Sequence, residues 1–293
     1  MPVQVAGRVL TMRRVGAYHA MTLLADGIAE EFRPGQFVAV AVGGPDSSML
    51  LHRAFSIHAV TERGQYGGTV TFVFAVTGRG TAWLARRRPN DAVDLVGPLG
   101  RSFRLPRDRA TATLVGGGYG SAPLFPLIDA LRARGCRVDA VLGAATADRL
   151  FGPLEAKRRT TSVVFTTEDA TMGERGRVSD VLPAVLEHTG SDVVYACGPM
   201  GMLRAVSAIA AARGIPCQVA VEESMACGIG VCMTCVLPVV GDDGTTRMVR
   251  SCVEGPVFGG DRVRFGEVGT VPADALGAPV APLADASPPG ATP

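Results

Sequence analysis

The first third of the chain alternates between apolar and polar residues with a period of two. Such runs occur at 5–12, 36–42 and 68–76, and glycine or proline turns lie between them. A period of two is typical of short β-strands that have one buried face. Because repeated strands within about 105 residues favour a small closed barrel, we expect residues 1–105 to form an antiparallel β-barrel domain.

The pattern changes at Thr111, after which short β-branched apolar runs alternate with segments of helical period. Predicted strands lie at 111–115, 136–144, 161–167 and 192–199. Predicted helices lie at 124–135, 178–188 and 200–214. Alternation of strands and helices indicates a parallel sheet covered by helices. We therefore expect an α/β domain over residues 106–218.

Two further segments follow the predicted α/β domain. Residues 219–268 carry four of the seven cysteines and form a third, small predicted domain. Residues 269–293 are rich in alanine, proline and glycine and have little hydrophobic periodicity. Such a composition cannot bury a core, so we expect a disordered tail there.

Composition narrows the class of protein. The 293 residues are 47% apolar and 19% charged, with a net charge of +2, so no general attraction to nucleic acid or an anionic membrane is expected. The N-terminus has no basic flank before an apolar stretch, and no apolar run approaches the roughly 18 residues of a membrane span. We expect a cytoplasmic protein, in which thiols stay reduced, and an odd number of cysteines also argues against a disulfide framework.

Four cysteines follow the pattern C-x4-C-x2-C-x16-C, which is the plant-type spacing for a [2Fe–2S] cluster. They are Cys227, Cys232, Cys235 and Cys252. Gly228 and Gly230 would let the loop wrap with backbone N–H groups directed at sulfur. Zinc is the alternative, because four thiolates also suit a tetrahedral structural site. Zinc ribbons usually pair two C-x2-C knuckles, however, and this segment has one.

Two glycine-containing loops follow predicted strands of the α/β domain. The first is G-G-G-Y-G-S-A-P at 116–123, and the second is C-G-P at 197–199. Glycines at a strand-to-helix turn let the backbone approach a phosphate, and ligands of an open parallel sheet bind at these strand ends. The first loop departs from G-x-G-x-x-G, and a tight structural turn is the alternative. Two such loops at one edge favour a dinucleotide site.

The barrel also contains candidate binding residues. In H-R-A-F-S-I at 52–57, the arginine could hold a phosphate, the aromatic ring could stack and the serine could reach a flavin ring. A surface arginine beside a core phenylalanine is the alternative. The segment T-G-R-G-T-A-W at 77–83 adds a glycine turn whose threonine could cap the next helix and hold a phosphate.

Taken together, these motifs resemble the electron-transfer, iron–sulfur flavoprotein subunit of type B, NAD-linked dihydroorotate dehydrogenase, a branch of the ferredoxin-reductase-like flavoproteins. The resemblance runs in order from residue 3 to about 265. It rests on R-P-G-Q-F-V, R-A-F-S, G-R-G-T, G-P-L-G, G-G-G-Y-G-S-A-P-L, A-C-G-P-M, E-E-S-M-A-C-G-I-G-V-C-M-T-C and C-V-E-G-P-V-F. Two departures are Ala54, where the family often has proline, and T-E-D-A-T at 167–171, where the family usually has T-x-D-G-S, which bears on the contacts of Glu168 and Asp169 to the dinucleotide.

The resemblance implies three cofactor sites. The residues implied for FAD are Arg53, Ala54, Phe55, Ser56, Val73, Phe74, Ala75, Gly80 and Thr81. Those implied for NAD(H) are Gly117, Gly118, Gly120, Ser121, Cys197, Gly198 and Pro199, and the four cysteines of the loop would hold the [2Fe–2S] cluster.

The resemblance also implies a function in pyrimidine biosynthesis. Electrons would pass from dihydroorotate through the FMN of a separate catalytic subunit to the cluster, then to FAD and NAD⁺, in a complex of two plus two subunits. We expect no catalytic acid or base in this chain. An NAD(P)H-driven reductase serving another oxidoreductase is one alternative, and a zinc-stabilised binding module is another.

Overall fold

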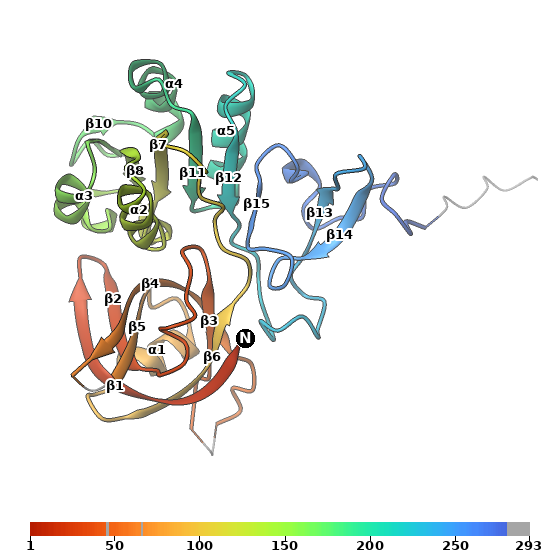
Figure 1. Cartoon of the computed structure of the whole chain (residues 1–293). Helices are drawn as coiled ribbons and strands as arrows, with labels where there is room; N and C mark the ends of the chain where they lie inside the picture. The colour runs from red at the N-terminus through yellow and green to blue at the C-terminus, as the bar shows by residue number, and fades with distance from the viewer. Residues whose placement is uncertain (45–46, 66, 280–293) are drawn as a thin grey trace, which may run out of the picture.

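The N-terminal third closes into a six-stranded antiparallel barrel (Figure 1) in the order β1-β2-β5-β4-β3-β6. The computed structural model describes residues 1–44, 47–65 and 67–279. The barrel strands are β1 (Val3–Val15), β2 (Tyr18–Leu24), β3 (Phe37–Val40), β4 (Arg53–Gly64), β5 (Gly67–Phe74) and β6 (Ala92–Leu99), with helix α1 (Arg79–Ala85) before β6. The predicted barrel is confirmed.

The barrel core follows from the period-two pattern. In β5, Val70, Phe72 and Phe74 are buried and face one side, as the alternation requires. They pack against Met21 and Leu23 from the neighbouring strand β2. Because every strand pairs on both sides, the barrel has no free edge.

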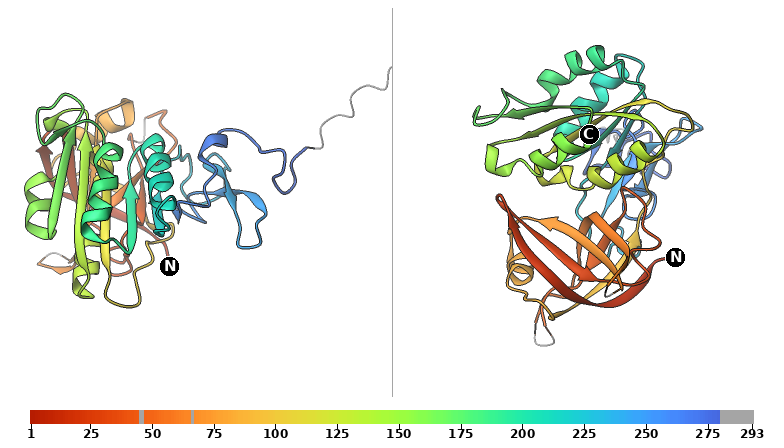
Figure 2. Two further views of the ribbon diagram at one scale, coloured as in Figure 1. Left: turned by 90° about the horizontal axis from the view of Figure 1, so that it is seen from above. Right: turned by 60° about the vertical axis from the view of Figure 1, so that its left-hand side comes forward.

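The second part of the chain forms a seven-stranded sheet in the order β10-β9-β8-β7-β11-β12-β15. Its parallel strands are β7 (Thr111–Gly117), β8 (Arg137–Ala144), β9 (Ser162–Thr167), β10 (Glu174–Arg175), β11 (Val193–Cys197) and β12 (Cys217–Ala220). Helices α2 (Leu124–Ala133) and α3 (Pro153–Arg159) lie on the face toward the barrel, and α4 (Val178–Thr189) and α5 (Met200–Ala211) cover the other face (Figure 2). The predicted α/β sheet is confirmed.

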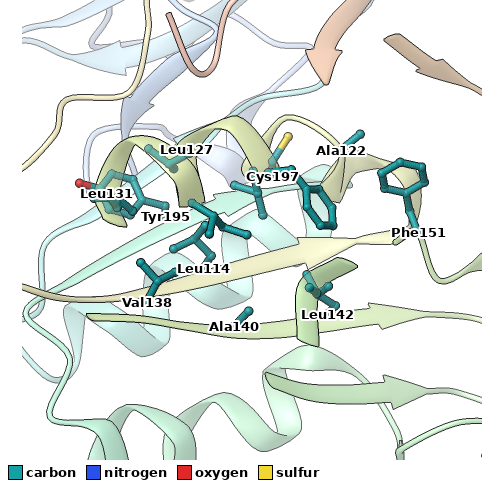
Figure 3. Close-up of a cluster of buried hydrophobic side chains, with 14 of the residues drawn as sticks. Leu114, Ala122, Leu127, Leu131, Val138, Ala140, Leu142, Phe151, Tyr195 and Cys197 are labelled. Atoms are coloured by element: carbon teal, nitrogen blue, oxygen red, sulfur yellow. The ribbon is translucent and has the colours of Figure 1, made fainter. Parts of the chain in front are cut away.

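One hydrophobic core of the sheet includes residues of the barrel. Figure 3 shows its centre, where Leu114 of β7, Leu127 of α2 and Tyr195 of β11 meet. The same cluster includes Tyr18 and Val73, which come from barrel strands. The barrel and the sheet are therefore held together by buried apolar contact, and this fixes the cavity between them.

The cysteine-bearing segment is built around the hairpin of β13 (Val236–Val240) and β14 (Thr246–Arg250). It then returns to the large sheet, where β15 (Val257–Gly259) pairs antiparallel with β12. The predicted boundary between residues 218 and 219 falls inside β12. The sequence did not predict β15, because three residues are too few to show a period of two.

Residues 269–279, predicted as the start of a disordered tail, instead pack against the hairpin. The Leu276 N–H donates to the Thr246 carbonyl at 2.8 Å, and Arg264 pairs with Asp274. Ala275 is buried there. The sequence did not predict this contact, because a single alanine produces no hydrophobic pattern. The rest of the predicted tail, 280–293, lies outside the described residues. Within the described part of the chain, no helix is long and apolar enough to cross a membrane.

Candidate cofactor sites

A cavity of about 350 Å³ opens between the barrel and the sheet. Eight of the nine residues that the sequence assigned to FAD line it: Arg53, Ala54, Phe55, Ser56, Val73, Phe74, Ala75 and Thr81. The ninth, Gly80, lies behind Arg53, because a Cβ added to it would be 3.1 Å from Arg53 Nε. We call this cavity the barrel pocket. Strands β4 and β5 pair directly and bring the two separate sequence motifs together.

The Arg53 guanidinium is held in place by its own loop. One terminal nitrogen donates to the carbonyls of Leu51 at 2.8 Å and His52 at 3.1 Å. No other described residue accepts from its remaining N–H groups, and the guanidinium lines the cavity beside Gly80. A guanidinium with a fixed orientation and free donors suits a phosphate, so the donor set fits the pyrophosphate of FAD.

Two other residues of the barrel pocket also make contacts with neighbouring residues of the protein. The ring of Phe55 stacks on Phe72, with centroids 4.7 Å apart and planes at 5°, so this ring belongs to the barrel wall. Thr81 Oγ1 accepts the N–H groups of Thr77 at 3.0 Å and Gly78 at 3.1 Å, which closes the first turn of α1 from inside. Helix capping by this threonine is therefore confirmed.

A second cavity, of about 490 Å³, lies at the carboxyl ends of β7, β8 and β9. We call it the sheet pocket. Of the residues assigned to NAD(H), Gly117, Gly118, Gly120 and Pro199 line it. The other three, Ser121, Cys197 and Gly198, lie behind that surface, where Ser121 Oγ donates to the Gly118 carbonyl at 2.8 Å. Burial raises the pKa of the Cys197 thiol well above its ordinary value, which keeps it protonated.

The two glycine loops touch each other, as expected for neighbouring strand ends. Strands β7 and β11 pair so that Gly116 is opposite Cys197. A Cβ added to Gly120 would lie 2.8 Å from the Gly198 Cα, so a side chain there would push the loops apart. The missing side chain at Gly198 makes room for this approach, and the missing side chain at Gly120 brings bare backbone to the cavity wall.

The sheet pocket also contains polar groups suited to a dinucleotide. Thr166 Oγ1 is buried and has no hydrogen-bond partner among the described residues, and Thr166 lines the cavity. Glu168 and Arg177 face each other across 3.7 Å at the same wall, and Arg149 lies nearby. A buried hydroxyl without a partner is costly unless a ligand supplies one. The residues present therefore fit a ribose or phosphate.

Tyr119 and Glu222 are site residues that sequence reasoning missed. Both line the barrel pocket and the sheet pocket. Glu222 is exposed to solvent between the two domains, yet the atoms packed around its carboxyl desolvate it and raise its pKa. Glu222 could have been predicted from its position, because it is an acidic residue just after a buried strand that ends at the ligand-binding edge of the sheet.

The four cysteines differ in their exposure to solvent. Cys232 is exposed and Cys227 is half-buried, whereas Cys235 and Cys252 are buried. Hydrogen bonds from Thr234 lower the pKa of Cys232 to about 6, whereas burial raises the pKa of Cys252 to about 12. No three His, Cys, Asp or Glu side chains of residues 1–44, 47–65 and 67–279 converge closely enough to hold a metal ion.

The loop backbone nevertheless fits a cluster held by thiolates. Gly228 and Gly230 have φ of +72° and +85°, which lets the chain curl around the thiols. The Val231 N–H donates to Cys227 Sγ at 3.3 Å, the kind of N–H···S bond that supports a thiolate ligand. Arg250 donates to the Gly230 carbonyl at 2.9 Å and pairs with Glu254, which ties the loop to the hairpin.

The buried cysteines pack directly on the barrel. Cys235 and Cys252 share a small apolar cluster with Phe37, Ala54 and Met225. The last three residues also line the barrel pocket. The apolar cluster of the buried cysteines and the barrel pocket thus have these three side chains in common.

An exposed apolar surface surrounds the cysteine loop. Ile229, Val231 and Met233 of the loop expose 54%, 76% and 52% of their surface, and Leu50 and Leu51 of the neighbouring barrel loop expose 86% and 54%. Leu50, Leu51 and Ile229 also line a shallow cavity together with Cys227. We call these five residues the apolar rim.

Comparison with known proteins gives consistent matches. Residues 222–264 match the model of the iron–sulfur cluster binding domain of dihydroorotate dehydrogenase B. The chain is 40% identical over 255 residues to the dihydroorotate dehydrogenase B (NAD(+)) electron transfer subunit of Geobacillus kaustophilus, covering 85% of this chain and 92% of the relative. It is 34% identical to the same subunit of Desulforamulus reducens, covering 80% and 87%.

Solved structures show the same architecture. The NADH-dependent reduced ferredoxin–NADP oxidoreductase, studied for flavin-based electron bifurcation, is 26% identical with a TM-score of 0.78 and covers 90% of this chain and 91% of its own. A ferredoxin NADP⁺ reductase from Neisseria gonorrhoeae, solved with FAD and NADP, is 17% identical with a TM-score of 0.58, covering 72% and 92%. This second likeness concerns the fold alone.

Proposed function

Because the chain belongs to the family of electron transfer subunits of dihydroorotate dehydrogenase B (NAD(+)), we propose that it carries electrons from an FMN-containing dihydroorotate dehydrogenase subunit to NAD⁺. The relatives' names give the reaction, and the two cavities and the cysteine loop of this chain supply a place for each carrier. The proposed context is the biosynthesis of pyrimidine nucleotides.

Each part of the chain has a separate task in this proposal. Arg53 holds the FAD phosphates in the barrel pocket, where the first turn of α1 at Thr81 also lies, while the loops at 116–120 and 197–199 hold NAD(H) in the sheet pocket. The four loop cysteines hold a [2Fe–2S] cluster. When bound, FAD exchanges two electrons with a nicotinamide and single electrons with an iron–sulfur cluster. The residues position and separate the carriers, and no side chain is assigned a proton-transfer role.

The observation that carries the proposal is that the apolar cluster of the buried cysteines shares side chains with the barrel pocket. Phe37, Ala54 and Met225 belong to or pack on that cluster and also line the pocket. One-electron transfer needs carriers to be close but not bonded, and these shared side chains supply that separation. The sheet pocket meets the barrel pocket on its other side, at Tyr119 and Glu222. The arrangement supports a path that enters at the cysteines and leaves at the nicotinamide.

We place the catalytic partner on the apolar rim. The rim surrounds Cys227 and Cys232, the two loop cysteines nearest to solvent. An apolar surface beside a one-electron carrier suits a stable interface with another redox protein. We propose a complex of two chains of each kind, working in the cytoplasm, where the seven cysteines, none of which forms a disulfide, would stay reduced.

A visible spectrum of the purified complex tests the function. Adding dihydroorotate should bleach the flavin and cluster absorbance, and adding NAD⁺ afterwards should restore it. If FAD and cluster stay oxidised while NADH alone bleaches them, the chain is a reductase that serves a different oxidoreductase. A colourless protein that contains zinc would overturn the redox function altogether.

Two variants separate the cluster from the flavin. Cys232→Ser should remove the cluster absorbance and leave FAD bound, because Cys232 lies outside the barrel pocket. Cys136→Ala is the matched control, since Cys136 is buried in the core of the sheet. Loss of cluster absorbance in the control as well would contradict the ligand assignment.

A second pair of variants tests the docking surface. Val231→Asp places a charge in the apolar rim and should lower the affinity for the catalytic subunit by tenfold or more, as buried charge is costly in an interface. Leu154→Asp changes an equally exposed leucine on α3, outside the rim, and should leave affinity unchanged. Equal affinities for both variants would place the interface elsewhere.

A further inference from the structure

A third cavity, of about 660 Å³, lies at the edge of the large sheet beside β15. It is larger than the barrel pocket and the sheet pocket, and it shares no lining residue with either. Its wall combines the linker that follows β6, helix α5, strands β12 and β15, and the turn between β13 and β14. Figure 1 shows β15 between the sheet and this hairpin. We call this space the edge cavity, and none of the three cofactor sites includes it.

The edge cavity carries an excess of positive charge. Six charged residues line it: Arg101, Arg104, Arg262, Asp242, Glu254 and Asp261. Arg262 pairs with Asp242 at 2.5 Å, and Glu254 pairs with Arg250 of the hairpin at 3.0 Å. Among the residues that the structure describes, no ion pair engages Arg101, Arg104 or Asp261. The uncompensated groups are therefore two guanidiniums and one carboxylate.

Arg101 and Arg104 are fixed at the backbone, whereas their side chains are exposed and unused. The Arg101 N–H donates to the Gly255 carbonyl at 2.6 Å. The Arg104 carbonyl accepts the Tyr195 hydroxyl at 2.9 Å and the Gln218 side-chain amide at 2.8 Å. Neither guanidinium donates a hydrogen bond to another residue of 1–44, 47–65 and 67–279. A guanidinium that has an anchored backbone and free donors is well suited to bind a phosphate.

The edge cavity also borders a buried hydroxyl that lacks a partner. Ser207 of α5 lines the cavity and is 5% exposed, and its Oγ makes no hydrogen bond within the described part of the chain. Ser207 packs against Gly260, because a Cβ added to Gly260 would overlap Oγ. A buried polar group without a partner is uncommon in a folded protein, and it marks places where a ligand or a bound water completes the structure. This hydroxyl is a second indication, independent of the arginines, that the cavity has an occupant.

We propose that the edge cavity binds a phosphate monoester of a hydroxyl-bearing small molecule, the class that includes nucleoside monophosphates and sugar phosphates. Arg101 and Arg104 bind the phosphate, whose negative charge matches the two unpaired guanidiniums. Asp261, the carboxylate without a partner, accepts a hydrogen bond from a hydroxyl group of the ligand. The cavity is larger than an inorganic phosphate needs, and Ile215 and Pro216 supply an apolar wall for the organic part. This inference does not depend on the proposed function, because it concerns a different cavity.

Calorimetry on the full chain, loaded with FAD and saturated with ADP-ribose, tests the edge cavity, because both cofactor pockets are then occupied. The probes are UMP, AMP, glucose 6-phosphate, inorganic phosphate and uridine. At least one monoester should bind more tightly than inorganic phosphate, and uridine, which has no phosphate, should not bind. Arg101→Ala combined with Arg104→Ala should weaken binding of that monoester tenfold or more, because charged hydrogen bonds are lost. Arg86→Ala combined with Arg88→Ala removes two exposed arginines outside the cavity and should leave the affinity unchanged.

Two further measurements separate loss of binding from misfolding. The melting temperature of the unchanged protein should rise with the concentration of the monoester, whereas the protein that lacks both cavity arginines should melt at the same temperature with and without it. Asp261→Ala should weaken the monoester relative to inorganic phosphate, because it removes the acceptor for the hydroxyl group and leaves both arginines. Arg101→Gln combined with Arg104→Gln replaces the alanine pair if that protein does not fold.

The outcomes are distinct. Binding that requires the phosphate, and that the cavity pair weakens while the control pair does not, supports the site. If no monoester binds, or if both arginine pairs weaken binding equally, Arg101 and Arg104 are solvated surface charges and the inference is wrong. If inorganic phosphate binds as tightly as every monoester, the ligand class is wrong and the proposal fails with it. None of these results bears on electron transfer from dihydroorotate to NAD⁺, which the visible spectrum tests separately.

Discussion

Gly230→Ala is the substitution that tests the geometry of the cysteine loop most directly. Gly230 has φ +85°, and a Cβ added there would overlap Val253 Cγ2. Gly244, in the turn of the same hairpin region, has φ +75° with nothing within 4 Å of an added Cβ. A substitution at either glycine therefore strains the backbone, but only a substitution at Gly230 also causes a steric overlap.

The expected losses follow from these two terms. A left-handed conformation costs a residue with a Cβ about 1–2 kcal/mol, so Gly244→Ala should lower the free energy of unfolding by that amount. Overpacking adds about 1–3 kcal/mol, so Gly230→Ala should lose about 2–5 kcal/mol in total. Val253 is branched at Cβ and cannot relieve the overlap by changing a distal torsion.

Urea unfolding followed by circular dichroism measures both losses, and visible absorbance measures how much cluster each variant retains. Val253→Ala in the Gly230→Ala background removes the overlapping methyl and should restore part of the loss, leaving a coupling energy of at least about 0.5 kcal/mol in the double-mutant cycle. If Gly230→Ala and Gly244→Ala lose equal stability and retain equal amounts of cluster, the steric reasoning is refuted.

Three further predictions follow from single contacts. Arg250→Ala removes the hydrogen bond to the Gly230 carbonyl and should speed loss of cluster absorbance in a chelator several-fold, whereas Arg247→Ala, which breaks an ion pair with Asp243 on the same hairpin, should not. Burial lowers the pKa of His58 below 6.5, so the unfolded chain binds a proton that the folded chain excludes. The free energy of unfolding in urea should therefore fall as pH drops from 6.5 toward the folded pKa, by up to about 1.4 kcal/mol per pH unit, and His58→Phe should abolish that slope. Tyr195→Phe removes the hydrogen bond from the buried hydroxyl to the Arg104 carbonyl at 2.9 Å and should cost about 1 kcal/mol in urea unfolding without changing FAD content.

Most of the fold could be predicted from local patterns in the sequence. The barrel followed from a period of two, and the sheet followed from strand and helix alternation ending in glycine turns such as the one at Gly135. The cofactor-binding motifs could also be predicted, because the spacing of their glycines or cysteines is characteristic. Eight of the nine residues predicted for FAD line one cavity, although β4 and β5 bring them from two separate motifs.

The parts that were missed depend on contacts between distant segments. Strand β15 exists because β12 offers it an edge, and three residues carry no period of their own. Ser121, Cys197 and Gly198 were assigned to the dinucleotide surface but lie behind it, because the sequence shows that a loop is near a ligand without showing which atoms face it. Tyr119 and Glu222 belong to two cavities at once, which no single motif can reveal.

The segment from Val221 to Met225 explains why the cysteine loop follows the sheet in the chain. It leaves β12 at the ligand edge, where Glu222 lies between the two pockets. Three residues later, Met225 lines the barrel pocket and packs with the buried cysteines. A connection of this length lets one strand end reach all three sites, so a few covalently linked residues set how far apart the two cavities and the buried cysteines lie. A loop attached anywhere else on the sheet would need an independent interface to achieve the same spacing.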